Sequence, residues 1–123
     1  MIRRLALALL LAGPAAAQAP RCGFGQGLEA MRGADRQLQA GVAAADLMPG
    51  RDAAEAAAAA LAEAAGRFEG CGCHQAAELT REAAGLAEQA RSEASTDRLG
   101  RALARARFSL GLARDRLDRR GCG

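Results

Sequence analysis

The sequence has few of the residues on which most catalytic sites depend. It contains no Trp, Tyr, Lys or Asn, three Phe, one His and few hydroxyl side chains. It also shows no Gly-rich phosphate loop, no paired carboxylates and no Ser/His/Asp set. These absences predict a protein that is not an enzyme. All 17 basic residues are Arg, and Ala and Gly are abundant, which indicates a GC-rich, bacterial coding sequence.

The chain begins with the features of a secretory signal peptide. Arg3 and Arg4 precede a short apolar run, and Ala15-Ala16-Ala17 forms a small-residue cleavage motif. We therefore expect residues 1–17 to be a signal peptide that is cleaved. The apolar run is shorter than the ~20 residues that span a bilayer, so we expect no transmembrane segment after cleavage. The expected location is the bacterial periplasm or the medium, where disulfides persist.

The rest of the chain is long enough for one domain. Residues 18–123 number 106 (123 less 17) and are predicted to form a single Ala-rich domain. Loss of Arg3 and Arg4 lowers the net charge from +3 to +1. A net charge so close to zero gives no reason to expect nucleic-acid binding. Because Ala side chains bury little area, the domain needs stabilisation beyond its apolar core.

Apolar and small residues recur at helical spacing in four stretches, and no strand pattern is present. The predicted helices span about residues 27–46, 52–69, 74–92 and 96–120. Ser95 or Thr96 is expected to cap the fourth. Helices of this length with short connections predict an all-α fold, a small up-down-up-down four-helix bundle of two helical hairpins.

Glycine, proline and acidic residues mark the predicted ends of the second helix. Pro49-Gly50 is expected to separate the first helix from the second. Asp52 and Glu55, three residues apart, are expected to form a capping box at the start of the second helix. Gly70 is expected to end it.

The four cysteines are spaced in two equal intervals. Cys22 and Cys71 are 49 positions apart, and so are Cys73 and Cys122. Each interval spans one predicted hairpin, so the bundle gathers all four cysteines at one pole. We favour disulfides Cys22–Cys71 and Cys73–Cys122, because each joins the two ends of one hairpin. In the chain-entropy model, closing a loop of about 50 residues stabilises the fold by about 4 kcal/mol. The crossed pairing, Cys22–Cys73 with Cys71–Cys122, is an open alternative.

The run Cys71-Gly72-Cys73-His74 also suits other chemistry. The main alternative is a copper or zinc site, because thiolates and imidazole bind both metals. Its ligands would be Cys22, Cys71, Cys73, His74 and Cys122. A second alternative is thiol exchange at Cys73, since a helix N-terminus and a neighbouring His both lower a thiol pKa. Covalent haem attachment requires C-x-x-C-H, and this run is one residue too short.

The last predicted helix carries most of the positive charge. Residues 97–120 have a net charge of +5, against −4 for residues 18–96. One face of this helix holds the candidate surface-binding residues Arg98, Arg101 and Arg105, continued by Phe108 and Leu112. They would suit an anionic surface or an acidic partner. We favour a structural interpretation, in which these arginines pair with acidic residues of the preceding helix, namely Glu78, Glu82 and Glu88.

Together these features predict a secreted or periplasmic module without enzymatic activity. It is expected to act through its helix surfaces, to need no cofactor and to bind a protein partner if it binds a macromolecule at all. The alternative function is that of a periplasmic protein that binds copper or zinc through its cysteines and His74.

Overall fold

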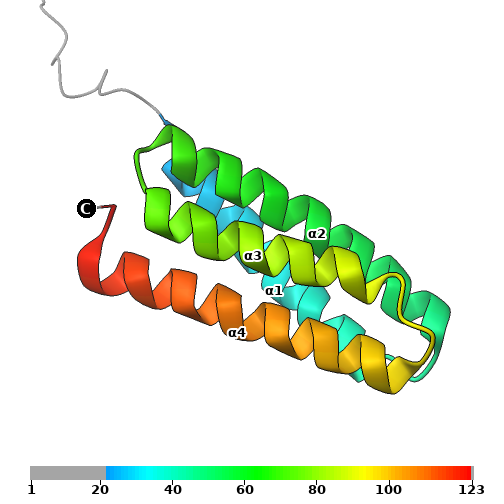
Figure 1. The fold of residues 1–123 in the computed structure, drawn as a ribbon. Coiled ribbons are helices and arrows are strands. Elements are labelled where there is room, and N and C mark those ends of the chain that lie inside the picture. Colours follow the sequence, from blue (N-terminus) through cyan, green and yellow to red (C-terminus); the bar gives the residue numbers. More distant parts are fainter. Residues whose placement is uncertain (1–21, 123) are drawn as a thin grey trace, which may run out of the picture.

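The predicted architecture is confirmed by the computed structural model, which describes residues 22–122. The proposed signal peptide, residues 1–17, lies outside the described part. Four helices follow one another, α1 (Phe24–Ala43), α2 (Leu47–Gly70), α3 (His74–Ala90) and α4 (Thr96–Arg120). They run up, down, up and down, so that α1 begins and α4 ends at the same pole of the bundle (Figure 1).

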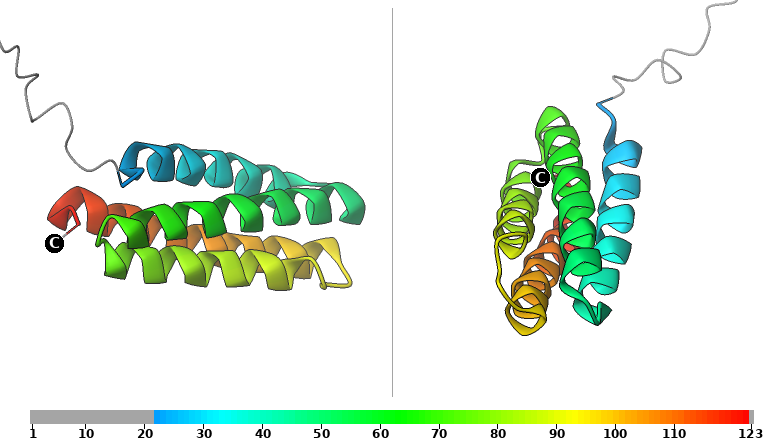
Figure 2. Two further views of the ribbon diagram at one scale, coloured as in Figure 1. Left: turned by 90° about the horizontal axis from the view of Figure 1, so that it is seen from above. Right: turned by 90° about the vertical axis from the view of Figure 1, so that its right-hand side faces the viewer.

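The two helical hairpins lie against each other. Each helix packs against the helix before and after it in the chain, and α4 also packs against α1 over a smaller area. Two further views show the α1–α2 hairpin covering the α3–α4 hairpin (Figure 2). Within residues 22–122, no helix is both long enough and apolar enough to cross a membrane.

The prediction for the start of α2 is wrong. This helix begins at Leu47, five residues before the predicted start, and its N-cap is Asp46 in an extended conformation. Pro49-Gly50 therefore lies in the first turn of α2 and does not separate two helices. Proline is tolerated there because the first backbone N–H groups of a helix have no partner within the helix. The capping box predicted for Asp52 and Glu55 is consequently absent.

The other boundaries differ less from the prediction. Helix α1 runs from residue 24 to 43, three residues earlier at each end than predicted, and α3 ends two residues early, at Ala90. The α4 boundaries are as predicted, and the Ser95 side chain accepts a hydrogen bond from the Arg98 backbone N–H at 3.2 Å, which confirms the predicted cap.

The turn between α2 and α3 depends on a glycine. Helix α2 ends at Gly70, one residue later than the predicted end at residue 69, and Gly72 two residues further on has a φ of +79°, a left-handed conformation that favours glycine. The Cys73 N–H donates to the Phe68 carbonyl at 2.8 Å, and the Gly72 N–H donates to the Glu69 carbonyl at 3.0 Å. This pair of bonds is a Schellman motif, and it reverses the chain within three residues.

The core is narrow because much of it is alanine. Its largest fully buried side chains are Met31, Leu38, Leu61, Phe68, Leu99, Leu103 and Leu110. Between them lie small residues that let the helices approach closely. At Gly41 in α1, a Cβ atom would collide with the Leu103 side chain of α4 and lie 3.3 Å from the Ala53 Cβ of α2. Glycine at this position therefore sets the distance between three helices.

Candidate functional site

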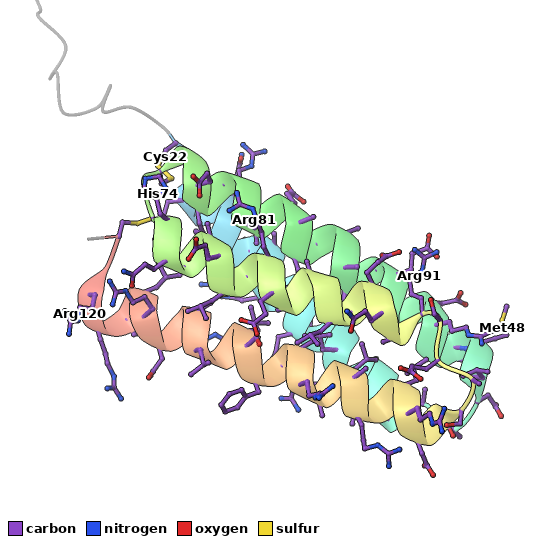
Figure 3. The ribbon with its side chains drawn as sticks, in the orientation of Figure 1. Cys22, Met48, His74, Arg81, Arg91 and Arg120 are labelled. Atoms are coloured by element: carbon purple, nitrogen blue, oxygen red, sulfur yellow. A yellow bond between two sulfur atoms is a disulfide. The ribbon has the colours of Figure 1, made fainter. Side chains whose placement is uncertain are left out.

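Both disulfides lie at one pole of the bundle, and their pairing is the one favoured from the spacing. Cys22 is bonded to Cys71, with a Cα–Cα distance of 4.9 Å, and Cys73 to Cys122, with a Cα–Cα distance of 4.3 Å. Cys22 and His74 mark this pole in Figure 3. Each disulfide joins the two ends of one hairpin.

The cysteine sulfurs are therefore engaged with one another. No cysteine in residues 22–122 is free. Nor does this part of the chain hold a group of three or more His, Cys, Asp or Glu side chains arranged around a metal position. Binding of copper or zinc through thiolates would first require reduction of the disulfides, because the metal ligand is the deprotonated thiol. For thiol exchange, a reacting thiol would have to reach Cys73, which is only 2% exposed.

His74 has a structural partner that sequence reasoning did not find. Its Nδ1 atom lies 2.9 Å from Oε1 of Glu69, and Nη1 of Arg81 lies 3.4 Å from the other Glu69 oxygen. The hydrogen bond from His74 is the main cause that holds the pKa of the Glu69 carboxyl below its ordinary value of 4.5, and Arg81 adds to it. The cluster connects the last turn of α2 to α3, and His74 and Arg81 are both labelled in Figure 3.

The three arginines singled out from the sequence lie together at the opposite end of the molecule. Arg98, Arg101 and Arg105 are exposed and line one depression of about 600 Å³, together with Glu93. None of the three makes an ion pair with any residue in the described range 22–122.

The predicted pairing of these arginines with α3 is therefore wrong. Glu88 is bound by Arg91, three residues further along the chain, at 2.7 Å. Glu82 lies beside Arg105 in a second depression but forms no ion pair with it within 4.0 Å. Glu78 is exposed on α3 and likewise makes no ion pair within residues 22–122. The arginines thus keep their charge available to solvent.

The depression at the arginines is the first of three that follow one another along α4, and it is lined by α4 and by Glu93 of the α3–α4 connection. The second, of about 510 Å³, is lined by Glu82 and Leu86 of α3 and by Phe108 of α4. The third, of about 380 Å³, lies nearer the disulfide pole and is lined by Leu79 and Leu112 among others. We call these three depressions together the α3–α4 groove.

Apolar side chains lie along this groove. Leu79 and Leu86 are only partly buried, because they lie at the edge of the core. Phe108 is 70% exposed and Leu112 is 42% exposed. The other two phenylalanines, Phe24 and Phe68, pack against each other with ring centroids 5.7 Å apart. Phe108 is thus the one aromatic side chain of the described residues that is left largely in solvent.

The fold and this groove define a class of protein: a small, disulfide-linked four-helix bundle with a basic and partly apolar surface on one helical hairpin. Comparison of the chain with models of protein families, with curated proteins and with solved structures finds no match.

Proposed function

We propose that the protein is an exported, non-enzymatic binding module that holds a protein partner in the α3–α4 groove. The observation that carries this proposal is the position of Phe108, 70% exposed, beside Arg105 on the helix face that also carries Arg98 and Arg101. None of these three arginines forms an ion pair within residues 22–122. Aromatic residues, Phe included, and Arg are enriched in protein interfaces relative to the rest of the surface.

The cost of leaving these residues in water supports the same conclusion. A Phe side chain has 150–250 Å² of surface to bury, and about 25 cal/mol is gained for each Å² of apolar area removed from water. Covering Phe108 and Leu112 would thus contribute several kcal/mol to association, by this area estimate. A scattered single apolar residue needs no explanation, but here Phe108 and Leu112 lie one helical turn apart and line depressions together with the partly buried Leu86 and Leu79.

The disulfides support a role outside the reducing cytoplasm. Two cross-links in a domain with an alanine-rich core fit the oxidising bacterial periplasm or the medium, and they agree with the signal peptide proposed for residues 1–17. Rigid helices also favour binding, because a preformed surface loses less conformational entropy when the partner docks.

The test is affinity purification of the protein from the cells that produce it, using three forms of the chain. Phe108→Asp removes the exposed aromatic group, and Met48→Asp is the matched control, because Met48 is also exposed, at 65%, and lies in the first turn of α2, outside the three depressions. Partner proteins should be retained by the wild type and the Met48 variant and lost from the Phe108 variant. Equal retention by all three forms, or no specific retention, would overturn the proposal.

The copper or zinc alternative is tested on the same purified material. We expect the intact mass of a chain that begins at Gln18. We also expect no thiol that reacts with alkylating reagents and no bound metal. Four reactive thiols with stoichiometric copper or zinc would favour the metal-binding function instead.

A further inference from the structure

We infer that the occupant of the α3–α4 groove is an acidic amphipathic helix of a partner protein. The inference rests on the proposed function and names the chemistry of the partner. It follows from the shape of the groove, its apolar floor and its charge.

The shape suits a helix. The groove extends along α4 from Arg98 to Arg120, and the antiparallel helix α3 forms its other side at the second and third depressions. These 22 residue steps correspond to about 33 Å at 1.5 Å per residue, which is the length of a helix of about 21 to 22 residues. An amphipathic helix placed there would become a fifth helix packed on α3 and α4, a common mode of helix-in-groove recognition.

The apolar residues have the spacing that such a helix requires. Leu79 and Leu86 are seven residues apart on α3, and Phe108 and Leu112 are four apart on α4. The two pairs lie on opposite sides of the groove. A docked helix with apolar residues at alternating steps of three and four would contact both sides along one face.

The charge of the groove selects an acidic partner. The residues that line the three depressions include six arginines and three carboxylates, a net charge of +3. Of the arginines, Arg98, Arg101 and Arg105 form no ion pair within residues 22–122 and gather at one end. Carboxylates on the flanks of an amphipathic helix would supply the missing partners and steer its approach.

Three other occupants fit the groove less well, two because of its charge and one because of its shape. A second copy of the chain would place one net charge of +3 against another. Residues 1–21 of this chain contain three arginines and no acidic residue, so they do not complement the groove. An anionic membrane would match the net charge, but Leu79 and Leu86 are only partly exposed and lie too deep for insertion into it.

The experiment uses a designed 21-residue peptide with Leu at alternating steps of three and four and Glu at most other positions, labelled for fluorescence polarisation. We expect saturable binding that weakens as salt is added, and NMR shift changes confined to α3 and α4. The triple variant Arg98→Glu, Arg101→Glu, Arg105→Glu should bind at least about tenfold more weakly. A peptide with Lys in place of Glu should not bind.

The control variant has the same net charge but changes arginines outside the groove, namely Arg32→Glu, Arg36→Glu and Arg114→Glu. Binding equal to that of the wild type supports the inference, and loss equal to that of the groove variant overturns it.

Absence of peptide binding, or equal binding of the Lys peptide, also overturns it. So does binding of phosphatidylglycerol vesicles, or self-association, in place of peptide binding. If the peptide fails to bind but the affinity purification still shows partner retention that depends on Phe108, only the inference fails. If the affinity purification shows no such retention either, the proposed function fails as well.

Discussion

The disulfide between Cys73 and Cys122 joins the N-cap of α3 to a residue two positions beyond the end of α4. It therefore closes into one covalent loop the two helices that form the α3–α4 groove. The second disulfide, Cys22–Cys71, closes the other hairpin, which contributes no residue to the three depressions. The two cross-links are alike in loop length and differ in what they enclose.

This difference predicts that the two disulfides affect binding unequally. Cys73→Ser with Cys122→Ser and Cys22→Ser with Cys71→Ser should each lower the free energy of unfolding by about 4 kcal/mol, from loops of equal length. At a temperature where both variants stay folded, loss of Cys73–Cys122 should weaken binding of the acidic peptide about fivefold, because the groove is less preorganised. Loss of Cys22–Cys71 should leave the peptide affinity unchanged. Urea unfolding and fluorescence polarisation measure the two effects, and equal losses of affinity would contradict the argument.

Two glycines in helix interiors should respond to alanine in opposite directions. A Cβ at Gly41 would collide with the fully buried Leu103 and crowd Ala53, whereas no atom lies within 4 Å of a Cβ at Gly66 in α2. Gly41→Ala should therefore destabilise the protein by about 1–3 kcal/mol through overpacking. Gly66→Ala should stabilise it by about 0.5–1 kcal/mol, because alanine favours the helix. Urea midpoints that shift in the same direction for both variants would show that Leu103 does not limit the approach of α4 to α1.

The sequence predicts the number and direction of the helices and the cysteine pairing because these depend on long-range periodicity. Apolar and small residues that recur at steps of three and four predict the helices. The equal 49-residue intervals between cysteines predict that all four lie at one pole. Ser95 could be predicted as a helix cap because it directly precedes the apolar pattern of the last helix.

The start of α2 could not be predicted because two readings of Pro49-Gly50 are locally equivalent. A proline fits both between two helices and in the first turn of one, and both Asp46 and Asp52 can act as caps. The choice depends on tertiary packing. A Cβ at Gly50 would lie 3.0 Å from the Leu99 side chain of α4, so this turn is held by a residue some fifty positions away.

The ion pairs of the groove were mispredicted for a related reason. Opposite net charges of two segments do not fix which side chains meet across a helix pair. Glu88 is taken by Arg91, a neighbour in sequence, and Arg105 lies beside Glu82 without reaching it. The candidate arginines and the exposed Phe108 were visible in the sequence as one helical face, but the contribution of Leu79 and Leu86 depends on the register of α3 against α4.

Arg51 is predicted to hold the α3–α4 connection against α2. Its Nη2 atom donates to the backbone carbonyl of Glu93 at 2.9 Å, across 42 residues of sequence, at the pole opposite the disulfides. Arg51→Ala should lower the free energy of unfolding by about 1–2 kcal/mol, since it leaves that carbonyl without this donor. It should also increase hydrogen exchange in residues 91–95, beside the arginine end of the groove. Arg36→Ala, an exposed arginine of α1, is the control, and an equal change in both variants would show that the Glu93 contact is not stabilising.

The Glu69 cluster predicts a dependence of stability on acid pH. Hydrogen bonding from His74 and the charge of Arg81 hold the pKa of the Glu69 carboxyl below its ordinary value of 4.5. A carboxyl whose pKa is lower in the folded state stabilises the fold above its unfolded pKa, and this contribution is lost as the pH falls through the folded pKa. Glu69→Gln should therefore be less stable than the wild type near pH 6, and the difference should shrink as the pH is lowered toward about 3.

Urea unfolding of the wild type and the Glu69→Gln variant between about pH 6 and about pH 3 measures the effect of the Glu69 carboxylate. Glu63→Gln is the matched control, because Glu63 is an exposed carboxylate of the same helix without an ion pair in residues 22–122. We expect the Glu63 variant to follow the wild type at every pH. His74→Ala should reproduce part of the Glu69→Gln effect, since it removes the hydrogen bond that contributes most to the lowered pKa. A Glu69→Gln difference that stayed constant from about pH 6 to about pH 3 would show that the carboxylate is not stabilised by these neighbours.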